Sequence, residues 1–113
     1  MKKKIIILGS TGSIGSTTLK IIDKKRSSFE VFLLSAKDNY NLICKQIKKY
    51  KPKYFVVTNS SVFNKVKKKF ENKKIKILDN PGFLMKIIKK DHFINSLEVC
   101  NLIKVTNINN INY

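Results

Sequence analysis

Four short apolar runs alternate along the chain with segments in which apolar residues recur at helical spacing. The runs at residues 5–8, 29–34 and 54–57 have almost no polar alternation, which is typical of strands buried on both faces of a parallel sheet. Residues 75–78 predict a short fourth strand. The intervening segments predict amphipathic helices over residues 14–24, 40–50, 60–70 and 80–88. Each predicted strand is therefore followed by a predicted helix.

This alternation of strands and helices predicts right-handed crossover connections and a parallel sheet. We expect an α/β fold of the Rossmann-like, doubly wound type, with an incomplete sheet of about four to five strands. In such a fold a ligand lies at the carboxyl ends of the strands.

Side-chain periodicity also predicts which residues face the sheet and which residues cap the helices. Asp38 is expected to cap the helix that begins at Tyr40, and Ser60 or Ser61 is expected to cap the next one. Asn80-Pro81 fits the start of the last helix. The residues expected on the inner face of the first helix are Ile14, Thr18, Ile21 and Ile22. Those expected on the inner face of the second helix are Tyr40, Ile43, Cys44, Ile47 and Tyr50.

Three glycines at a spacing of three, Gly9, Gly12 and Gly15, join the first strand to the first helix. A strand that turns sharply, admits a charged ligand to its backbone and starts a closely packed helix needs residues without Cβ at such points. The turn would present the amides of Thr11 to Ile14 to a diphosphate at the positive end of the helix dipole. A tight turn without a ligand is the simpler alternative. The spacing G-x-x-G-x-x-G does not fix which dinucleotide binds.

The residues that follow the second strand would face the adenosine ribose of a dinucleotide. An acidic residue there commonly accepts the ribose 2′-hydroxyl of NAD, whereas small, hydroxyl or basic residues suit the 2′-phosphate of NADP. Ser35, Ala36 and Lys37 fit the second case. Asp38 adds a negative charge beside them, and Lys37 is the neighbouring residue that could compensate for it.

The chain resembles the N-terminal part of the 1-deoxy-D-xylulose 5-phosphate reductoisomerase family in three ordered motifs. These motifs are G-S-T-G-S-I-G at residues 9–15, F-E-V-F-L-L-S-A at residues 29–36 and K-P-K-Y-F-V-V at residues 51–57. The resemblance covers residues 4 to about 88 and fades beyond Lys90, where Val99 and Leu102 stand in place of glycines that relatives carry. Relatives also carry a basic residue where Asp38 stands.

The resemblance implies an NADP-dependent reductoisomerase with NADPH as its cofactor. The family rearranges and reduces 1-deoxy-D-xylulose 5-phosphate to 2-C-methyl-D-erythritol 4-phosphate, a step in isoprenoid precursor synthesis. Full-length relatives use a divalent cation, Mg²⁺ or Mn²⁺, held by a catalytic domain, and the family suggests a homodimer. The residues implied to bind the cofactor are Gly9, Ser10, Thr11, Gly12, Ser13, Ile14, Gly15, Ala36, Lys37 and Asn39.

The resemblance also implies how the chain is divided. Residues 1–90 are expected to form the NADPH-binding domain, and residues 91–113 a degenerate or frayed segment. The seven acidic residues of the chain form no motif with metal-ligand spacing, so we expect the catalytic and metal-binding residues to lie in a missing or separately encoded catalytic domain. The chain alone should not turn over substrate.

The formal charge of +17 would suit a nucleic-acid partner. Arg26 is the only arginine, however, and the lysines are scattered over every predicted helix. We therefore favour a compositional bias towards Lys, Ile and Asn, with salt-sensitive nonspecific binding to polyanions. Two alternatives remain open: the cofactor domain of another NAD(P)-dependent dehydrogenase or epimerase, and a non-enzymatic basic nucleic-acid-binding module.

The remaining chemistry-bearing residues give little signal. Cys44 and Cys100 show neither a disulfide framework nor metal spacing, and Cys44 is expected to be a buried reduced thiol. His92 is the only histidine, and we expect it to be exposed to solvent rather than catalytic. The N-terminal apolar run is too short for a signal peptide and ends at Gly9, so a cytoplasmic protein without a membrane segment is expected.

Overall fold

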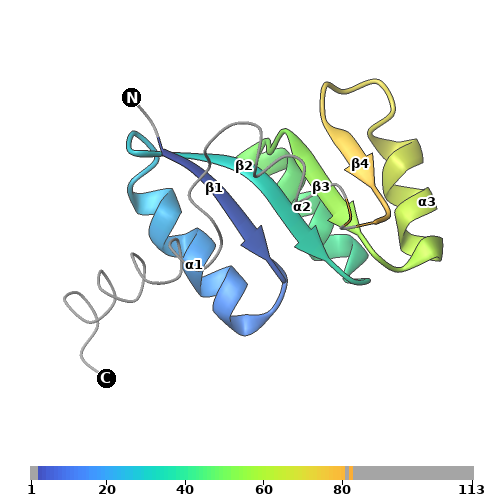
Figure 1. The fold of residues 1–113 in the computed structure, drawn as a ribbon, viewed down its shortest axis with the longest axis horizontal. Coiled ribbons are helices and arrows are strands. Elements are labelled where there is room, and N and C mark those ends of the chain that lie inside the picture. Colours follow the sequence, from blue (N-terminus) through green and yellow to red (C-terminus); the bar gives the residue numbers. More distant parts are fainter. Residues whose placement is uncertain (1–2, 81, 83–113) are drawn as a thin grey trace.

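The computed structural model describes residues 3–80 and 82, which form a parallel four-stranded sheet with helices between successive strands (Figure 1). The strands are β1 (Lys3–Leu8), β2 (Phe29–Ala36), β3 (Tyr54–Val57) and β4 (Lys76–Leu78), and they lie side by side in the order β1-β2-β3-β4. The helices are α1 (Ser13–Lys24), α2 (Tyr40–Tyr50) and α3 (Ser60–Lys69). The predicted α/β class, the parallel pairing and the four described strands are confirmed.

The helices pack on one face of the sheet and bury its main core. Side chains of β1, β2 and β3 form a single cluster with the inner faces of the helices. The members at its centre are Ile5, Leu19, Ile22, Leu34, Ile43, Phe55, Val57 and Val66. Because the strands follow one another in sheet order, right-handed crossovers carry the three helices to the same side.

The opposite face of the sheet carries a second, smaller cluster made of Ile6, Phe32, Leu33 and Val56. A β-bulge explains why two consecutive residues of β2 belong to it. Ile5 pairs with Val31 but Ile6 pairs with Leu33, so that Phe32 is the extra residue. Both faces of the sheet are therefore buried, which accounts for apolar runs without polar alternation.

The expected inner face of α1 is confirmed for Thr18, Ile21 and Ile22 but is wrong for Ile14. Ile14 is 78% exposed, and the buried residues of α1 are Gly15, Thr18, Leu19 and Ile22. Gly15 faces the sheet because its missing side chain lets α1 approach the end of β1. The expected inner face of α2 is confirmed, with Cys44 buried as a free thiol.

The caps of α2 and α3 form at residues next to the expected ones. Asn39 caps α2, and its side chain accepts a hydrogen bond from the Leu42 amide at 3.3 Å, so Asp38 is not the cap. Asn59 caps α3 in the same way through the Val62 amide at 3.0 Å, so Ser60 and Ser61 are not caps. The helix expected from Asn80-Pro81 and the segment 91–113, with His92 and Cys100, lie outside the described residues.

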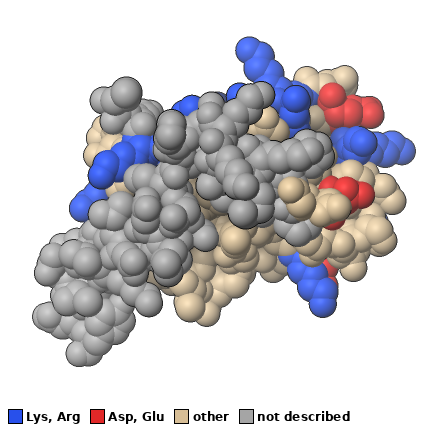
Figure 2. Space-filling view, in the orientation of Figure 1, with Lys and Arg blue, Asp and Glu red and all other residues tan. Residues whose placement is uncertain are grey.

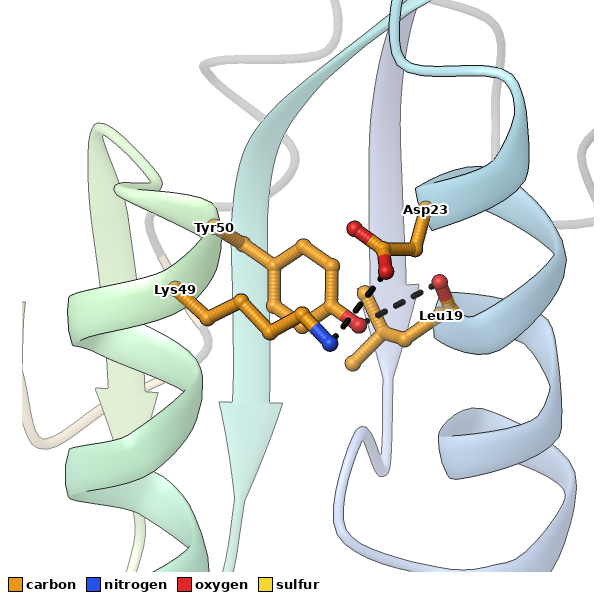
Figure 3. A network of polar contacts seen from close by, with 4 residues as sticks. All are labelled: Leu19, Asp23, Lys49 and Tyr50. Atoms are coloured by element: carbon orange, nitrogen blue, oxygen red, sulfur yellow. Dashed lines mark hydrogen bonds and ion pairs between the residues drawn. The ribbon is translucent and has the colours of Figure 1, made fainter.

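A polar contact at the far ends of α1 and α2 ties the two helices together (Figure 3). The Tyr50 hydroxyl donates a hydrogen bond to the Leu19 carbonyl oxygen at 3.3 Å. Beside it, Lys49 Nζ lies 3.2 Å from Asp23 Oδ2, an exposed ion pair of small energetic value. Burial raises the pKa of the Tyr50 phenol above its ordinary value, and the nearby Lys49 ammonium partly offsets this.

We expect Tyr50→Phe to lower the free energy of unfolding at neutral pH by about 1 kcal/mol, because it removes this hydrogen bond. Since the folded protein favours the neutral phenol, the stability that Tyr50 adds is lost as pH rises through its raised pKa. The difference in the free energy of unfolding between the parent chain and Tyr50→Phe should therefore shrink under alkaline conditions. Urea unfolding at neutral and alkaline pH measures it, and an equal difference at both would contradict this explanation.

Candidate functional site

The turn between β1 and α1 has the geometry that its first and second glycines predict. Gly9 adopts a φ of +72°, a left-handed conformation in which a side chain would be strained. The Gly12 amide donates to the Gly9 carbonyl oxygen at 3.2 Å and closes the turn. Gly12 is also the N-cap of α1, and no side chain caps this helix.

Gly15 sits where α1 touches the end of β1. A Cβ at this position would overlap the Gly9 carbonyl oxygen and lie 2.7 Å from the Ser10 Cα. Both neighbours are backbone atoms, so neither could move aside without displacing the turn. The third glycine therefore sets the distance between helix and strand, as the sequence predicts.

The turn is held from beneath by residues of β2 and α2. Ser10 is fully buried, and both its amide and its hydroxyl donate to the Ser35 carbonyl oxygen. The Ser10 carbonyl oxygen accepts a hydrogen bond from Gln46 Nε2 at 2.9 Å, and the Gly9 amide donates to Ser35 Oγ at 3.1 Å. Ser10, one of the expected cofactor-binding residues, therefore supports the turn from below.

Gln46 is a supporting residue that sequence reasoning missed. Its side chain is 4% exposed and lies among apolar residues of α2. A polar residue on the apolar face of a predicted helix was the available signal, because a buried amide needs a hydrogen-bond partner. The partner itself lies 36 residues away in sequence and only the fold identifies it.

We expect Gln46→Leu, which keeps a side chain of similar size, to lower the free energy of unfolding by about 1 kcal/mol. The Ser10 carbonyl oxygen would lose its shortest side-chain donor. Amide hydrogen exchange at residues 9–12 should also become faster, because the turn would no longer be held by α2. Unchanged exchange in this turn would contradict the supporting role of Gln46.

The upper surface of the turn offers backbone donors to an anion. Within the described part of the chain, the amides of Ser13, Ile14 and Gly15 have no acceptor, as expected for the first turn of a helix. None of the three helices has an acidic residue in its first turn. All three begin at the carboxyl edge of the sheet, so their positive dipole ends favour negative charge there.

Apolar surface borders the same turn. Among the described large apolar side chains, Leu8 at 50% and Ile14 at 78% are the exposed ones. Leu8 ends β1 and Ile14 lies in the first turn of α1, so the two flank Gly9 and Gly12 in the sequence. The site therefore combines unpaired amides with exposed aliphatic side chains.

The end of β2 lies next to the turn and carries the other expected binding residues. Ala36 is buried, and its carbonyl oxygen accepts from the Thr58 amide, while that of Lys37 accepts from the Asn59 amide. These bonds fix the backbone and leave the Lys37 side chain exposed. Asn39 Oδ1 is engaged in capping α2, and Asp38 is exposed with no capping role.

Other kinds of site find no support in the described residues. Across residues 3–80 and 82, no three His, Cys, Asp or Glu side chains gather into a group that could hold a metal ion. No helix of that part of the chain is long and apolar enough to cross a membrane. On the face shown in Figure 2, the visible Lys and Arg side chains are spread around the molecule rather than gathered in one patch.

Comparison with known proteins identifies the family. The family model for 1-deoxy-D-xylulose 5-phosphate reductoisomerase matches residues 5–106. The chain belongs to this family. Curated relatives named 1-deoxy-D-xylulose 5-phosphate reductoisomerase include that of Pelagibacter ubique, 40% identical over 82% of this chain, and that of Elusimicrobium minutum, 41% identical over 84%. The sequence-based assignment is confirmed.

Solved structures of the same family share the fold. The reductoisomerase from Zymomonas mobilis in complex with NADPH superposes with a TM-score of 0.68 at 24% identity, covering 76% of this chain and 23% of that one. A second, solved with NADPH, fosmidomycin and magnesium, gives a TM-score of 0.70 at 20% identity over 80% of this chain and 22% of its own. The chain spans about a quarter of the length of the curated relatives, 24% for the Pelagibacter protein.

Proposed function

We propose that this chain is the NADPH-binding portion of a 1-deoxy-D-xylulose 5-phosphate reductoisomerase. The observation that carries the proposal is the turn of residues 9–15, in which the amides of Ser13, Ile14 and Gly15 have no acceptor among the described residues at the start of α1. The amides of Ser13, Ile14 and Gly15 would bind the diphosphate, and the exposed residues Gly12 and Ser13 would admit it closely. Gly9, Gly12 and Ser10 shape the turn that makes this possible.

The adenosine end of the cofactor would lie at the end of β2. Its 2′-phosphate would contact the exposed Lys37, with Ala36 and Asn39 on either side. Asn39 Nδ2 is available as a donor because its Oδ1 is the atom that caps α2. The carboxylate of Asp38 would weaken NADPH binding at this subsite, since it would repel the two negative charges of the 2′-phosphate.

We expect Asp38→Asn to tighten NADPH binding by about five- to tenfold, since two charge repulsions across several ångströms of solvent are each worth about 0.7 kcal/mol. NADH, which lacks the 2′-phosphate, should gain nothing. Glu71→Gln removes the same charge from the opposite edge of the sheet and serves as the control. Equal gains for NADPH and NADH would place Asp38 away from the 2′-phosphate.

The reaction itself requires more than the described residues provide. In the proposed full assembly, a further catalytic portion would hold the divalent cation and the sugar phosphate, and the complete enzyme would rearrange and reduce 1-deoxy-D-xylulose 5-phosphate as a homodimer. NADPH supplies the hydride for the reduction. Here the chain's own role is to bind and orient the cofactor. We assign cofactor binding to residues 1–90. We propose no cofactor-binding residue within residues 91–113.

Two further proposals concern the surroundings of the chain. The charge of +17 supports salt-sensitive, nonspecific contact with polyanions in addition to NADPH binding. We also propose a cytoplasmic location for the chain.

Calorimetric titration of the 113-residue chain with NADPH and with duplex DNA, at low and moderate salt, tests the proposed function. Micromolar NADPH binding that persists at moderate salt, beside DNA binding that falls steeply, is the expected result. DNA binding without any NADPH binding would overturn the cofactor proposal and favour a basic nucleic-acid-binding module.

A further inference from the structure

A hollow lies at the amino ends of the strands, at the opposite end of the sheet from the glycine turn. It has a volume of about 720 Å³ and is formed by the start of β2, the end of α2, and the segments before β3 and β4. Its apolar lining is made of Val31, Ile47, Pro52, Phe70 and Ile75. A volume of this size falls in the range of about 300–1,000 Å³ that small-molecule sites occupy.

Lysines surround this apolar floor. The hollow is lined by Lys48, Lys51, Lys53, Lys73 and Lys74, all of them exposed, against a single carboxylate, that of Glu30. The carboxyl ends of α2 and α3 also point towards this end of the sheet and contribute roughly half a negative charge each. The Lys53 ammonium lies over the Phe32 and Tyr54 rings on the other face of the sheet, which leaves four lysines at the hollow. Their four positive charges exceed these negative charges, so the hollow keeps a net positive potential.

The backbone at Lys51 adds an independent observation. Lys51 adopts a φ of 47° and a ψ of 54°, and it is the only described residue other than glycine with a positive φ. Glycine is the residue that usually ends a helix in this conformation, because a Cβ is strained there. The chain instead keeps a lysine whose side chain lines the hollow. Strain of this kind is retained where the side chain has a use.

We propose that this hollow is a binding site for a small organic anion, with an apolar body on the floor and a phosphate or carboxylate head among the lysines. A second copy of the chain would not fit this role, because its own charge is +17. The segment 83–113 is also net basic and does not supply the missing negative charge. The site is separate from the glycine turn and does not depend on NADPH binding.

The test uses 2-naphthyl phosphate as the probe and its fluorescence anisotropy as the signal. Inorganic phosphate, which does not fluoresce and is measured by its displacement of the probe, supplies the head group alone. 2-Naphthol supplies the apolar body alone, and 2-naphthoate supplies a carboxylate in place of the phosphate. We expect saturable one-to-one binding of the naphthyl phosphate or the naphthoate, at least tenfold tighter than that of phosphate or 2-naphthol. Equal binding of 2-naphthol would overturn the proposal, since charge would then have no part in it.

Variants separate this site from general attraction of anions to a basic protein. Lys51→Gly should weaken probe binding at least threefold while raising the melting temperature, because it removes an ammonium and relieves the backbone. Lys73→Gln with Lys74→Gln should weaken binding at least tenfold. The matched pair Lys45→Gln with Lys65→Gln, which removes two charges outside the hollow, should leave binding within twofold. Equal losses in both pairs, or no loss in either, would contradict the site.

Discussion

Gly12→Asp should abolish measurable NADPH binding while making the protein more stable. Gly12 occupies the N-cap position of α1 with an extended backbone, and no side chain caps this helix. A Cβ at Gly12 would meet nothing closer than the Gly9 carbonyl oxygen at 3.5 Å, an ordinary contact. The new carboxylate can cap the amides of Ile14 or Gly15 and interact with the helix dipole, a gain of about 0.5–1 kcal/mol. The same carboxylate occupies the donors proposed for the diphosphate and repels it, so affinity should fall by about 100-fold or more.

Two companion variants separate the causes of that loss. Gly12→Asn has nearly the same shape and capping ability but no charge, so it should lose less affinity than Gly12→Asp. Asn64→Asp adds one negative charge on α3, away from the turn, and should bind NADPH as the parent does. Calorimetry for affinity and thermal unfolding for stability measure both effects. If the Gly12→Asp protein binds NADPH as tightly as the parent does, the diphosphate does not bind at this turn.

Gly15→Ala should produce the largest loss of stability of any single methyl group added to the turn. The new Cβ would overlap the Gly9 carbonyl oxygen and crowd the Ser10 Cα, so α1 must move away from β1. Overpacking of this kind costs about 1–3 kcal/mol, and the upper end is expected because both neighbours are backbone atoms. NADPH binding should fall as well, since the amides move with the helix.

Gly12→Ala is the matched control for Gly15→Ala, because its added methyl group meets only an ordinary contact. Urea unfolding of the two variants should differ by about 2 kcal/mol in the free energy of unfolding. If the two variants have the same free energy of unfolding, a methyl group at position 15 is tolerated, and the close packing of α1 against β1 does not determine stability in solution.

Most of the fold can be predicted from the sequence, because the patterns that predict it lie within short stretches of the chain. Mainly apolar runs marked the strands, and Pro52 marked the end of α2, which stops at Tyr50. Gly9 and Gly15 marked the turn and the close helix contact, and the structure has a positive φ at the first and no room for a Cβ at the second. Each of these signals depends on backbone properties of one or two residues.

The details that were mispredicted depend on contacts between distant segments. Asp38 and Asn39 are adjacent and both suit an N-cap, as do Asn59 and Ser60. The choice follows from backbone bonds between the ends of β2 and β3, such as Asn59 to Lys37, which fix where each helix starts. Ile14 turned outward because Gly15 is the residue that packs against β1.

One feature of the core and one of the candidate site also lay beyond sequence reasoning. The bulge at Phe32 changes which residues of β2 face each side, and it depends on pairing with β1. Gln46 reaches the Ser10 carbonyl oxygen only because α2 crosses behind the turn. By contrast, the family could be recognised from the order of three motifs, which are continuous stretches of sequence.

The most direct test of the central claim is an NMR titration of the ¹⁵N-labelled chain with NADPH at moderate salt. If the turn holds the diphosphate, the amide signals of Ser13, Ile14 and Gly15 should shift most and saturate together with those of residues 37–39. If those signals stay in place while shifts spread over the lysine-bearing surfaces and vanish as salt increases, the turn does not bind the cofactor.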